Sequence, residues 1–150
     1  MSKGRVGVGL WALLLPTVVA AQRSGGGGGG GGVTLPQAAQ AAQRAWLRHD
    51  TQGLVAQSPN LVLRIPGTDA STPLARAQAA ELLRRYLRPV EERSLEVREI
   101  KEVEGGTEGF VELDRRYIVA GTRDVRRETL FLGFRRMGER WVLTELRSAP

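Results

Sequence analysis

The sequence contains no cysteine, one histidine and, among its 22 basic residues, only two lysines, Lys3 and Lys101. Without cysteine there is no disulfide framework, no thiol nucleophile and no thiolate metal ligand, so stability must come from packing. A single histidine excludes a zinc site built from several imidazoles. The glycine run from Gly25 to Gly32 lacks the Lys-Ser/Thr of a phosphate-binding loop and follows no strand. We therefore expect no metal and no cofactor.

The formal net charge of +6 is carried almost entirely by arginine. Arginine pairs occur at 84–85, 115–116, 126–127 and 135–136, interleaved with glutamate and spread over several predicted elements. A nucleic-acid surface needs basic residues gathered on one face, with exposed aromatic rings to stack bases. The pattern instead indicates a solvated surface of mixed charge and predicts no nucleic-acid partner.

Residues 1–21 have the layout of a secretory signal peptide. Lys3 and Arg5 precede an apolar run from Val6 to Ala21, which Pro16 interrupts, and small residues allow cleavage after Ala20 or Ala21. The alternative is a retained membrane anchor, but the run is shorter than the ~20 apolar residues that a span needs. No cysteine follows for lipid attachment. We expect export to the periplasm or the extracellular space, with no stable membrane anchor after cleavage.

Residues 22–33 form a predicted linker, and residues 34–150 form one predicted domain. Glycine loses much conformational freedom on ordering and has no side chain to bury, so the run from Gly25 to Gly32 is typical of a flexible connection. The remaining residues are enough for one modest core.

The first half of this domain predicts two helices and a strand. Residues 34–49 are rich in Ala and Gln, and Ala39, Ala42, Trp46 and His49 fall on one helical face. Asp50 or Thr51 can cap a short helix over residues 52–57. Residues 61–65 alternate as a strand, with Leu61, Leu63 and Ile65 on one face and Arg64 on the other, before a Pro-Gly turn.

The second half predicts a long helix followed by an antiparallel sheet. Thr72 and Pro73 supply an N-cap and a first helical residue for a helix over residues 74–87, which Pro89 ends. Four strands follow, over residues 95–104, 110–120, 128–136 and 141–147, with a bulge expected near Arg98 and Glu99. The order predicts an α+β domain with helices packed on one side of a curled sheet.

This order resembles the nuclear transport factor 2-like superfamily, which includes ketosteroid isomerase, scytalone dehydratase and the polyketide cyclases. The matching segments are His49-Asp50, Gly53-Leu54-Val55, the strand of residues 61–65, Pro66-Gly67, residues 78–83, residues 131–134 and the closing segment 138–147. The resemblance covers residues 35–147, and its motifs specify a fold more than an activity. It implies a cystatin-like cone, in which the curved sheet wraps around the long helix and a pocket opens at the wide end.

Enzymes of this superfamily place an acid or a base inside the cone, such as an Asp with a Tyr or an Asp–His pair. Here His49 is the only imidazole available as a general base, but its place on the apolar face also suits a partly buried, structural histidine. Asp50 matches the family's Asp at the helix junction, where capping is the ordinary role. Trp46, Tyr86 and Tyr117 are candidates for a ligand pocket, and core packing is the alternative for both tyrosines.

Charged residues of the strands are interpreted as pairing across the outer face of the sheet. The acidic members are Glu112, Asp114, Glu128 and Glu145, and the basic members are Arg115, Arg126, Arg136 and Arg147.

Two hypotheses for function remain. The first is a non-catalytic exported module that binds a small apolar ligand in the cone or a protein partner on the sheet face, with a homodimer as one form of the latter. The second is a small lyase or isomerase of the ketosteroid isomerase or polyketide cyclase type, which uses His49 as an acid or base together with Tyr86, Tyr117 or a carboxylate of a strand.

Overall fold

The computed structural model describes residues 31–69, 71–103 and 105–150. The predicted signal peptide and residues 22–30 of the predicted linker therefore lie outside the described residues. Among the residues described, no helix is both long enough and apolar enough to cross a membrane.

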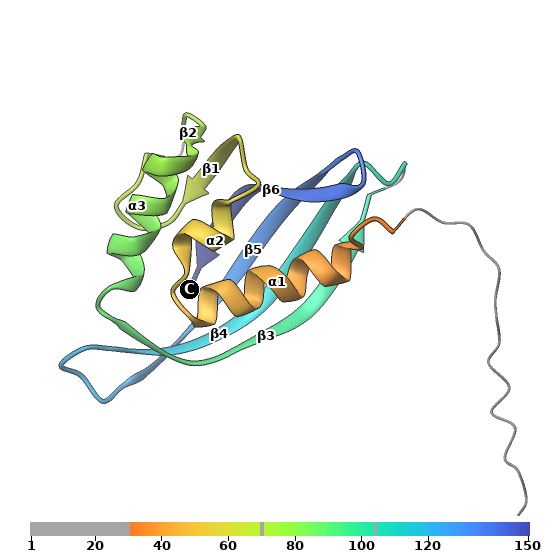
Figure 1. Ribbon diagram of the computed structural model, residues 1–150. Helices are drawn as coiled ribbons and strands as arrows, with labels where there is room; N and C mark the ends of the chain where they lie inside the picture. The colour runs from red at the N-terminus through yellow and green to blue at the C-terminus, as the bar shows by residue number, and fades with distance from the viewer. Residues whose placement is uncertain (1–30, 70, 104) are drawn as a thin grey trace, which may run out of the picture.

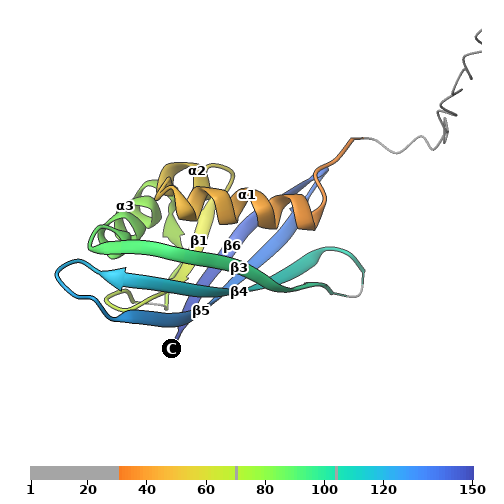
Figure 2. The ribbon, with the colours of Figure 1, turned by 90° about the horizontal axis from the view of Figure 1, so that it is seen from below.

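Three helices cover one face of a six-stranded curved sheet, and the other face is open (Figures 1 and 2). The strand order is β2-β1-β6-β5-β4-β3, with β1 parallel to β6 and every other neighbouring pair antiparallel. The elements are α1 (Leu35–Leu47), α2 (Thr51–Val55), β1 (Asn60–Arg64), β2 (Leu74–Ala75), α3 (Arg76–Leu87), β3 (Val90–Glu102), β4 (Glu108–Val119), β5 (Val125–Met137) and β6 (Arg140–Ala149). The predicted α+β cone is confirmed.

Side-chain caps fix the N-terminal ends of α1 and α2. Thr34 and Gln37 form a reciprocal capping box at the start of α1, with Pro36 in its first turn. The Asp50 carboxylate accepts a hydrogen bond of 2.8 Å from the Gly53 amide, so its predicted capping role is confirmed. A side chain at position 53 would collide with that carboxylate, which is why glycine suits the first turn of α2.

The start of α3 differs from the prediction. Thr72 and Pro73 do not begin the helix, which starts at Arg76 after an N-cap, Ala75, that has no capping side chain. The reason is that residues 74 and 75 pair with β1, placing Ala75 opposite Asn60 and Leu74 opposite Leu61. The local preference of Thr72 and Pro73 for a helix start is overridden by backbone hydrogen bonds to β1, about 14 residues earlier in the chain. Intrinsic helix propensity does not include such pairing between distant residues.

Strand β3 begins at Val90, five residues before the prediction, and bends twice. Its register against β4 shifts between Glu92 and Ser94 and again between Val97 and Glu99. The second shift confirms the expected bulge, and it returns Ile100 to the inner face, opposite the buried Val111. The first shift lies close to the C-terminal end of α1, where Glu92 accepts a hydrogen bond from Trp46. This shift places the Glu92 side chain inside the cone.

The core lies between the helices and the inner face of the sheet. It includes the apolar faces of α1, α3 and the strands: Ala39, Ala42, Trp46, Leu61, Leu63, Ile65, Ala79, Leu83, Leu87, Val111, Leu113, Leu130, Leu132 and Phe134. Gly109 lets α1 approach the sheet closely, because a Cβ at this position would overlap the Leu35 side chain. The packing encloses a group of charged side chains inside the cone, around Arg115.

Candidate functional site

Arg115, in the middle of β4, points into the cone and its side chain is 0% exposed. The interpretation that Arg115 and Glu128 pair on the outer face is therefore wrong for both residues. Their inward position follows from strand alternation, because Arg115 lies between Leu113 and Tyr117, which already face inward. Glu128 is directly opposite Arg115 on β5, so it must point to the same side.

Two buried carboxylates hold the Arg115 guanidinium. Nη2 lies 2.6 Å from Oε1 of Glu92, and Nη1 lies 2.6 Å from Oε2 of Glu128. Nε donates to both oxygens of Glu92 at 3.1 Å, and Nη1 also donates to the Tyr86 hydroxyl oxygen at 3.0 Å. The side chains of Glu92 and Glu128 are only 4% and 8% exposed. Such short, multiple contacts are what a buried ion group needs to offset the cost of leaving water.

Aromatic side chains complete the group. Trp46 donates its indole N–H to Oε1 of Glu92 at 3.1 Å, and the Tyr86 hydroxyl donates to Oε1 of Glu128 at 2.6 Å. The Arg115 guanidinium carbon lies 4.2 Å from the ring centroid of Tyr117, 4.9 Å from that of Trp46 and 5.3 Å from that of Tyr86. The three predicted pocket residues thus come together in the cone, and the structure places an arginine of the same chain among them.

The bonding pattern fixes the charge states of the group. Burial lowers the pKa of Arg115, but hydrogen bonds and charge interactions with Glu92 and Glu128 outweigh burial and raise it above its usual value. Burial, followed by the hydrogen bond to Glu128, raises the pKa of the Tyr86 phenol, against the opposing charge of Arg115. Arg115 therefore stays cationic and Tyr86 stays neutral at physiological pH.

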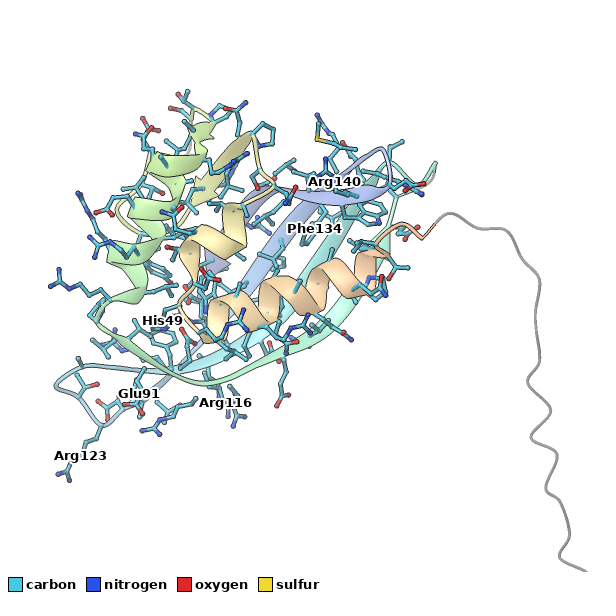
Figure 3. The ribbon with its side chains drawn as sticks, in the orientation of Figure 1. His49, Glu91, Arg116, Arg123, Phe134 and Arg140 are labelled. Atoms are coloured by element: carbon cyan, nitrogen blue, oxygen red, sulfur yellow. The ribbon has the colours of Figure 1, made fainter. Side chains whose placement is uncertain are left out.

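His49 lies at the edge of this group, at the C-terminal end of α1 (Figure 3). Its backbone has φ 53°, because α1 ends in a Schellman motif in which His49 donates to the Trp46 carbonyl and Asp50 to the Ala45 carbonyl. Glycine is the usual residue there. The imidazole Nε2 lies 3.7 Å from Oε1 of Glu92, with 32% of the side chain exposed. This separation exceeds hydrogen-bond distance.

Both carboxylates of the interior group are already engaged. Both oxygens of Glu92 and both oxygens of Glu128 already accept hydrogen bonds from Arg115, Trp46 or Tyr86. Some of the best-defined hollows along the described residues, of about 120–340 Å³, are lined by residues other than His49, Trp46, Tyr86 and Tyr117. Within the described ranges, no three imidazole or carboxylate groups lie close enough together to hold a metal ion. This arrangement suits holding the cone together better than proton transfer.

A groove of about 340 Å³ crosses the open outer face of the sheet. Phe110, Phe131 and Gly133 lie along it, and Phe110 is 48% exposed. A side chain at position 133 would crowd Glu145, with its Cβ 3.2 Å from the Glu145 Cβ. Large apolar side chains exposed in a hollow are a common sign of a binding surface.

One row of side chains runs across this outer face from β1 to β3. The strand registers place Arg64, Arg147, Phe131, Glu112 and Glu99 side by side, in that order. The row is basic on one side of Phe131 and acidic on the other. The Arg147 guanidinium carbon stacks 4.3 Å from the Phe131 ring centroid, and the predicted outward position of Arg64 is confirmed by its 53% exposed side chain.

No protein-family model matches this sequence, and no curated protein matches it closely enough to be a relative. Solved structures do match the fold. A ketosteroid isomerase-like protein from Erwinia carotovora atroseptica has a TM-score of 0.63 at 19% identity, covering 77% of this chain and 95% of that chain. A protein of ketosteroid isomerase-like fold from Catenulispora acidiphila, in complex with trimethylamine, has a TM-score of 0.60 at 16% identity, covering 78% and 87%.

A third structure, a putative polyketide cyclase from Pseudomonas putida, has a TM-score of 0.58 at 13% identity and covers 79% of this chain and 92% of that chain. Identities this low show the fold and leave the activity open. The predicted resemblance is confirmed at this level. The helices on one face of a curved, unclosed sheet, the strand order and these matches agree: the chain has the cone fold of the nuclear transport factor 2-like superfamily.

Proposed function

We propose that this domain is a non-catalytic module whose outer sheet face binds a second copy of the same chain. The observation that carries the proposal is the row of Arg64, Arg147, Phe131, Glu112 and Glu99, with opposite charges on the two sides of an aromatic centre. A surface with this arrangement is complementary to itself, which is what a two-fold symmetric interface requires.

The symmetry can be stated strand by strand. A two-fold axis along β5, lying between the two sheets, sets β6 of one copy over β4 of the other and β1 over β3. Arg147 then faces Glu112, and Arg64 faces Glu99, each contact occurring twice, while Phe131 lies on the axis. An apolar centre with a charged rim is the usual anatomy of a protein interface.

The contents of the cone favour binding on the outer sheet face over binding of an apolar ligand inside the cone. Arg115 occupies the space between Trp46, Tyr86 and Tyr117, and its charge is poorly suited to an apolar ligand. For the lyase or isomerase alternative, the 3.7 Å gap from His49 to Glu92 and the engagement of that carboxylate by Arg115 speak against an acid–base pair.

We expect protein purified after expression of the full chain to have the mass of a dimer in native mass spectrometry and in light scattering. Phe110→Glu puts a charge into the groove and is expected to raise the dimer dissociation constant at least tenfold. Met137→Glu is the matched control, because Met137 is also 48% exposed but lies at the β5–β6 turn. A monomeric wild type at micromolar concentration contradicts the proposal. A small molecule retained by the purified protein would instead support ligand binding in the cone.

A charge exchange tests the symmetry itself. Arg147→Glu alone and Glu112→Arg alone each place like charges opposite one another in the dimer, so each is expected to weaken it by about tenfold or more. The combined variant restores opposite charges at both contacts and is expected to dimerise within a few-fold of wild type. If the combined variant is weaker than either single variant, the axis does not run along β5.

Export is part of the proposal and rests on the sequence of residues 1–21 alone. We expect the intact mass of the exported protein to correspond to a chain that begins at Ala21 or Gln22. A secreted or periplasmic product that still contains Met1 to Ala20 contradicts cleavage, and recovery of the whole chain in the membrane fraction would support the anchor alternative.

A further inference from the structure

Two arginines lie directly opposite each other on the outer face, near the β4–β5 turn. Arg116 of β4 pairs in register with Arg127 of β5, and both side chains are exposed. Figure 3 shows Arg116 pointing away from the helices. Like charges at directly opposed positions of an antiparallel pair destabilise the sheet. Neither guanidinium makes an ion pair with another described residue.

The same two arginines line a hollow of about 290 Å³. Its lining consists of Arg98, Asp114, Arg115, Arg116, Arg127, Glu128, Thr129 and Pro150. The side chains of Arg115 and Glu128 point into the cone, so the ionisable side chains on the outer face are Arg98, Arg116, Arg127 and Asp114, with a net charge of +2. Arg115 is paired with both Glu92 and Glu128, and Arg98 lies 3.5 Å from Glu112 and 3.4 Å from Asp114. The arginines of the hollow that have no ion pair with another described residue are therefore Arg116 and Arg127.

We propose that this hollow binds a phosphate dianion, free or as a phosphomonoester, between the Arg116 and Arg127 guanidinium groups. Residues directly opposite on neighbouring strands have Cβ atoms about 5 Å apart, so two long side chains can converge on one small ligand. Each guanidinium offers two parallel N–H donors that match a pair of oxyanion oxygens. The Thr129 hydroxyl, next along β5 on the same face, adds a further donor.

Charge and size favour phosphate over a simple carboxylate. A carboxylate carries one negative charge and two oxygens, which satisfies one arginine fork, whereas a phosphate dianion has two charges and enough oxygens for both. The volume of about 290 Å³ exceeds that of a bare oxyanion and leaves room for a small substituent. A local violation of pairing rules on a sheet face, without a compensating partner in the protein, is a feature of functional sites.

The test is a calorimetric titration of the full-chain protein with inorganic phosphate, phenyl phosphate and acetate at constant ionic strength. We expect both phosphates to bind at least tenfold more tightly than acetate. Tighter binding of phenyl phosphate than of inorganic phosphate assigns the site to phosphomonoesters, and equal binding assigns it to free phosphate. Acetate binding as tight as phosphate, or no phosphate binding to either the wild type or the Phe110→Glu variant, overturns the proposal.

Variants separate a specific site from general attraction to a basic protein. Arg116→Gln with Arg127→Gln is expected to weaken phosphate binding at least tenfold, while its thermal midpoint stays equal or rises because like-charge repulsion is removed. Arg44→Gln with Arg48→Gln changes the net charge equally at exposed positions in and after α1, on the opposite side of the sheet, and is expected to bind as wild type does. Equal losses in the two double variants would overturn the proposal. A dimer about an axis along β5 would place Arg127 at the interface, so the titration is also carried out with Phe110→Glu. Binding to Phe110→Glu but not to the wild type shows a site that the dimer covers, and absence of binding to both overturns the proposal.

Discussion

Arg115→Met is expected to lower the free energy of unfolding by about 3–5 kcal/mol. Removing the guanidinium leaves Glu92 and Glu128 as two unpaired carboxylates at 4% and 8% exposure. The cost arises because each buried anion loses its counter-charge and cannot regain water. Since domains of this size are stable by only about 5–15 kcal/mol, the variant is expected to be close to unfolding at 37 °C.

Arg98→Met is the matched control for Arg115→Met. Arg98 also bridges two carboxylates, lying 3.5 Å from Glu112 and 3.4 Å from Asp114, but its side chain is 56% exposed. Exposed ion pairs contribute little because water and salt screen them, so we expect a loss of about 1 kcal/mol or less. Chemical denaturation of both variants measures the difference. Similar losses in the two variants would show that burial is not what makes the Arg115 group important.

A triple variant tests whether the unpaired carboxylates cause the loss. Combining Arg115→Met with Glu92→Gln and Glu128→Gln removes all three charges, while the amide oxygens can still accept from Trp46 and Tyr86. We expect the triple variant to be more stable than Arg115→Met alone, because replacing a whole buried ion group is far less costly than removing one member. A triple variant less stable than the single one would mean that lost packing around the rings dominates.

The outline of this fold can be predicted from local patterns because those patterns are strong here. The apolar faces of α1 and α3, the Asp50 cap and the bulge before Glu99 each depend on residues near one another in the chain. The start of α3 could not be predicted in the same way. Leu74 is held by β1, and no residue between positions 70 and 76 encodes that pairing.

The inward position of Arg115, Glu128 and Glu92 was harder to predict from the sequence, for a different reason. Arg115 and Glu128 are charged, and charged side chains are almost never fully buried unless they are paired, so an outer-face position was the natural expectation. Strand alternation carried the contrary signal, because Arg115 lies between Leu113 and Tyr117 on the inner face. Glu92 could not have been placed, since the register shift before Ser94 decides which way it points. If strand alternation were given more weight than residue type, the inward positions of Arg115 and Glu128 could be predicted, but that of Glu92 could not.

Tyr86→Phe is expected to lower the free energy of unfolding by about 1.5–3 kcal/mol near neutral pH, because it removes a hydrogen bond to a charged, buried acceptor. The Tyr86 hydroxyl lies 2.6 and 2.9 Å from the two oxygens of Glu128. The loss is expected to shrink as the pH rises above about 10. Burial and the Glu128 carboxylate raise the pKa of Tyr86 in the folded protein above the ordinary tyrosine value of about 10.

Proton linkage determines how the free energy of unfolding changes with pH. Above pH 10 the unfolded chain releases the Tyr86 proton while the folded protein keeps it, so wild-type stability falls by up to about 1.4 kcal/mol per pH unit from this group. Tyr86→Phe has no such proton, and its stability curve is expected to be flatter between pH 9 and 11. Tyr117→Phe is the control, because it removes the other tyrosine hydroxyl and keeps the one that bonds Glu128. If Tyr86→Phe and wild type lose stability in parallel over this range, the phenol proton is not held by the Glu128 carboxylate, and the interior group is more open to water than its contacts indicate.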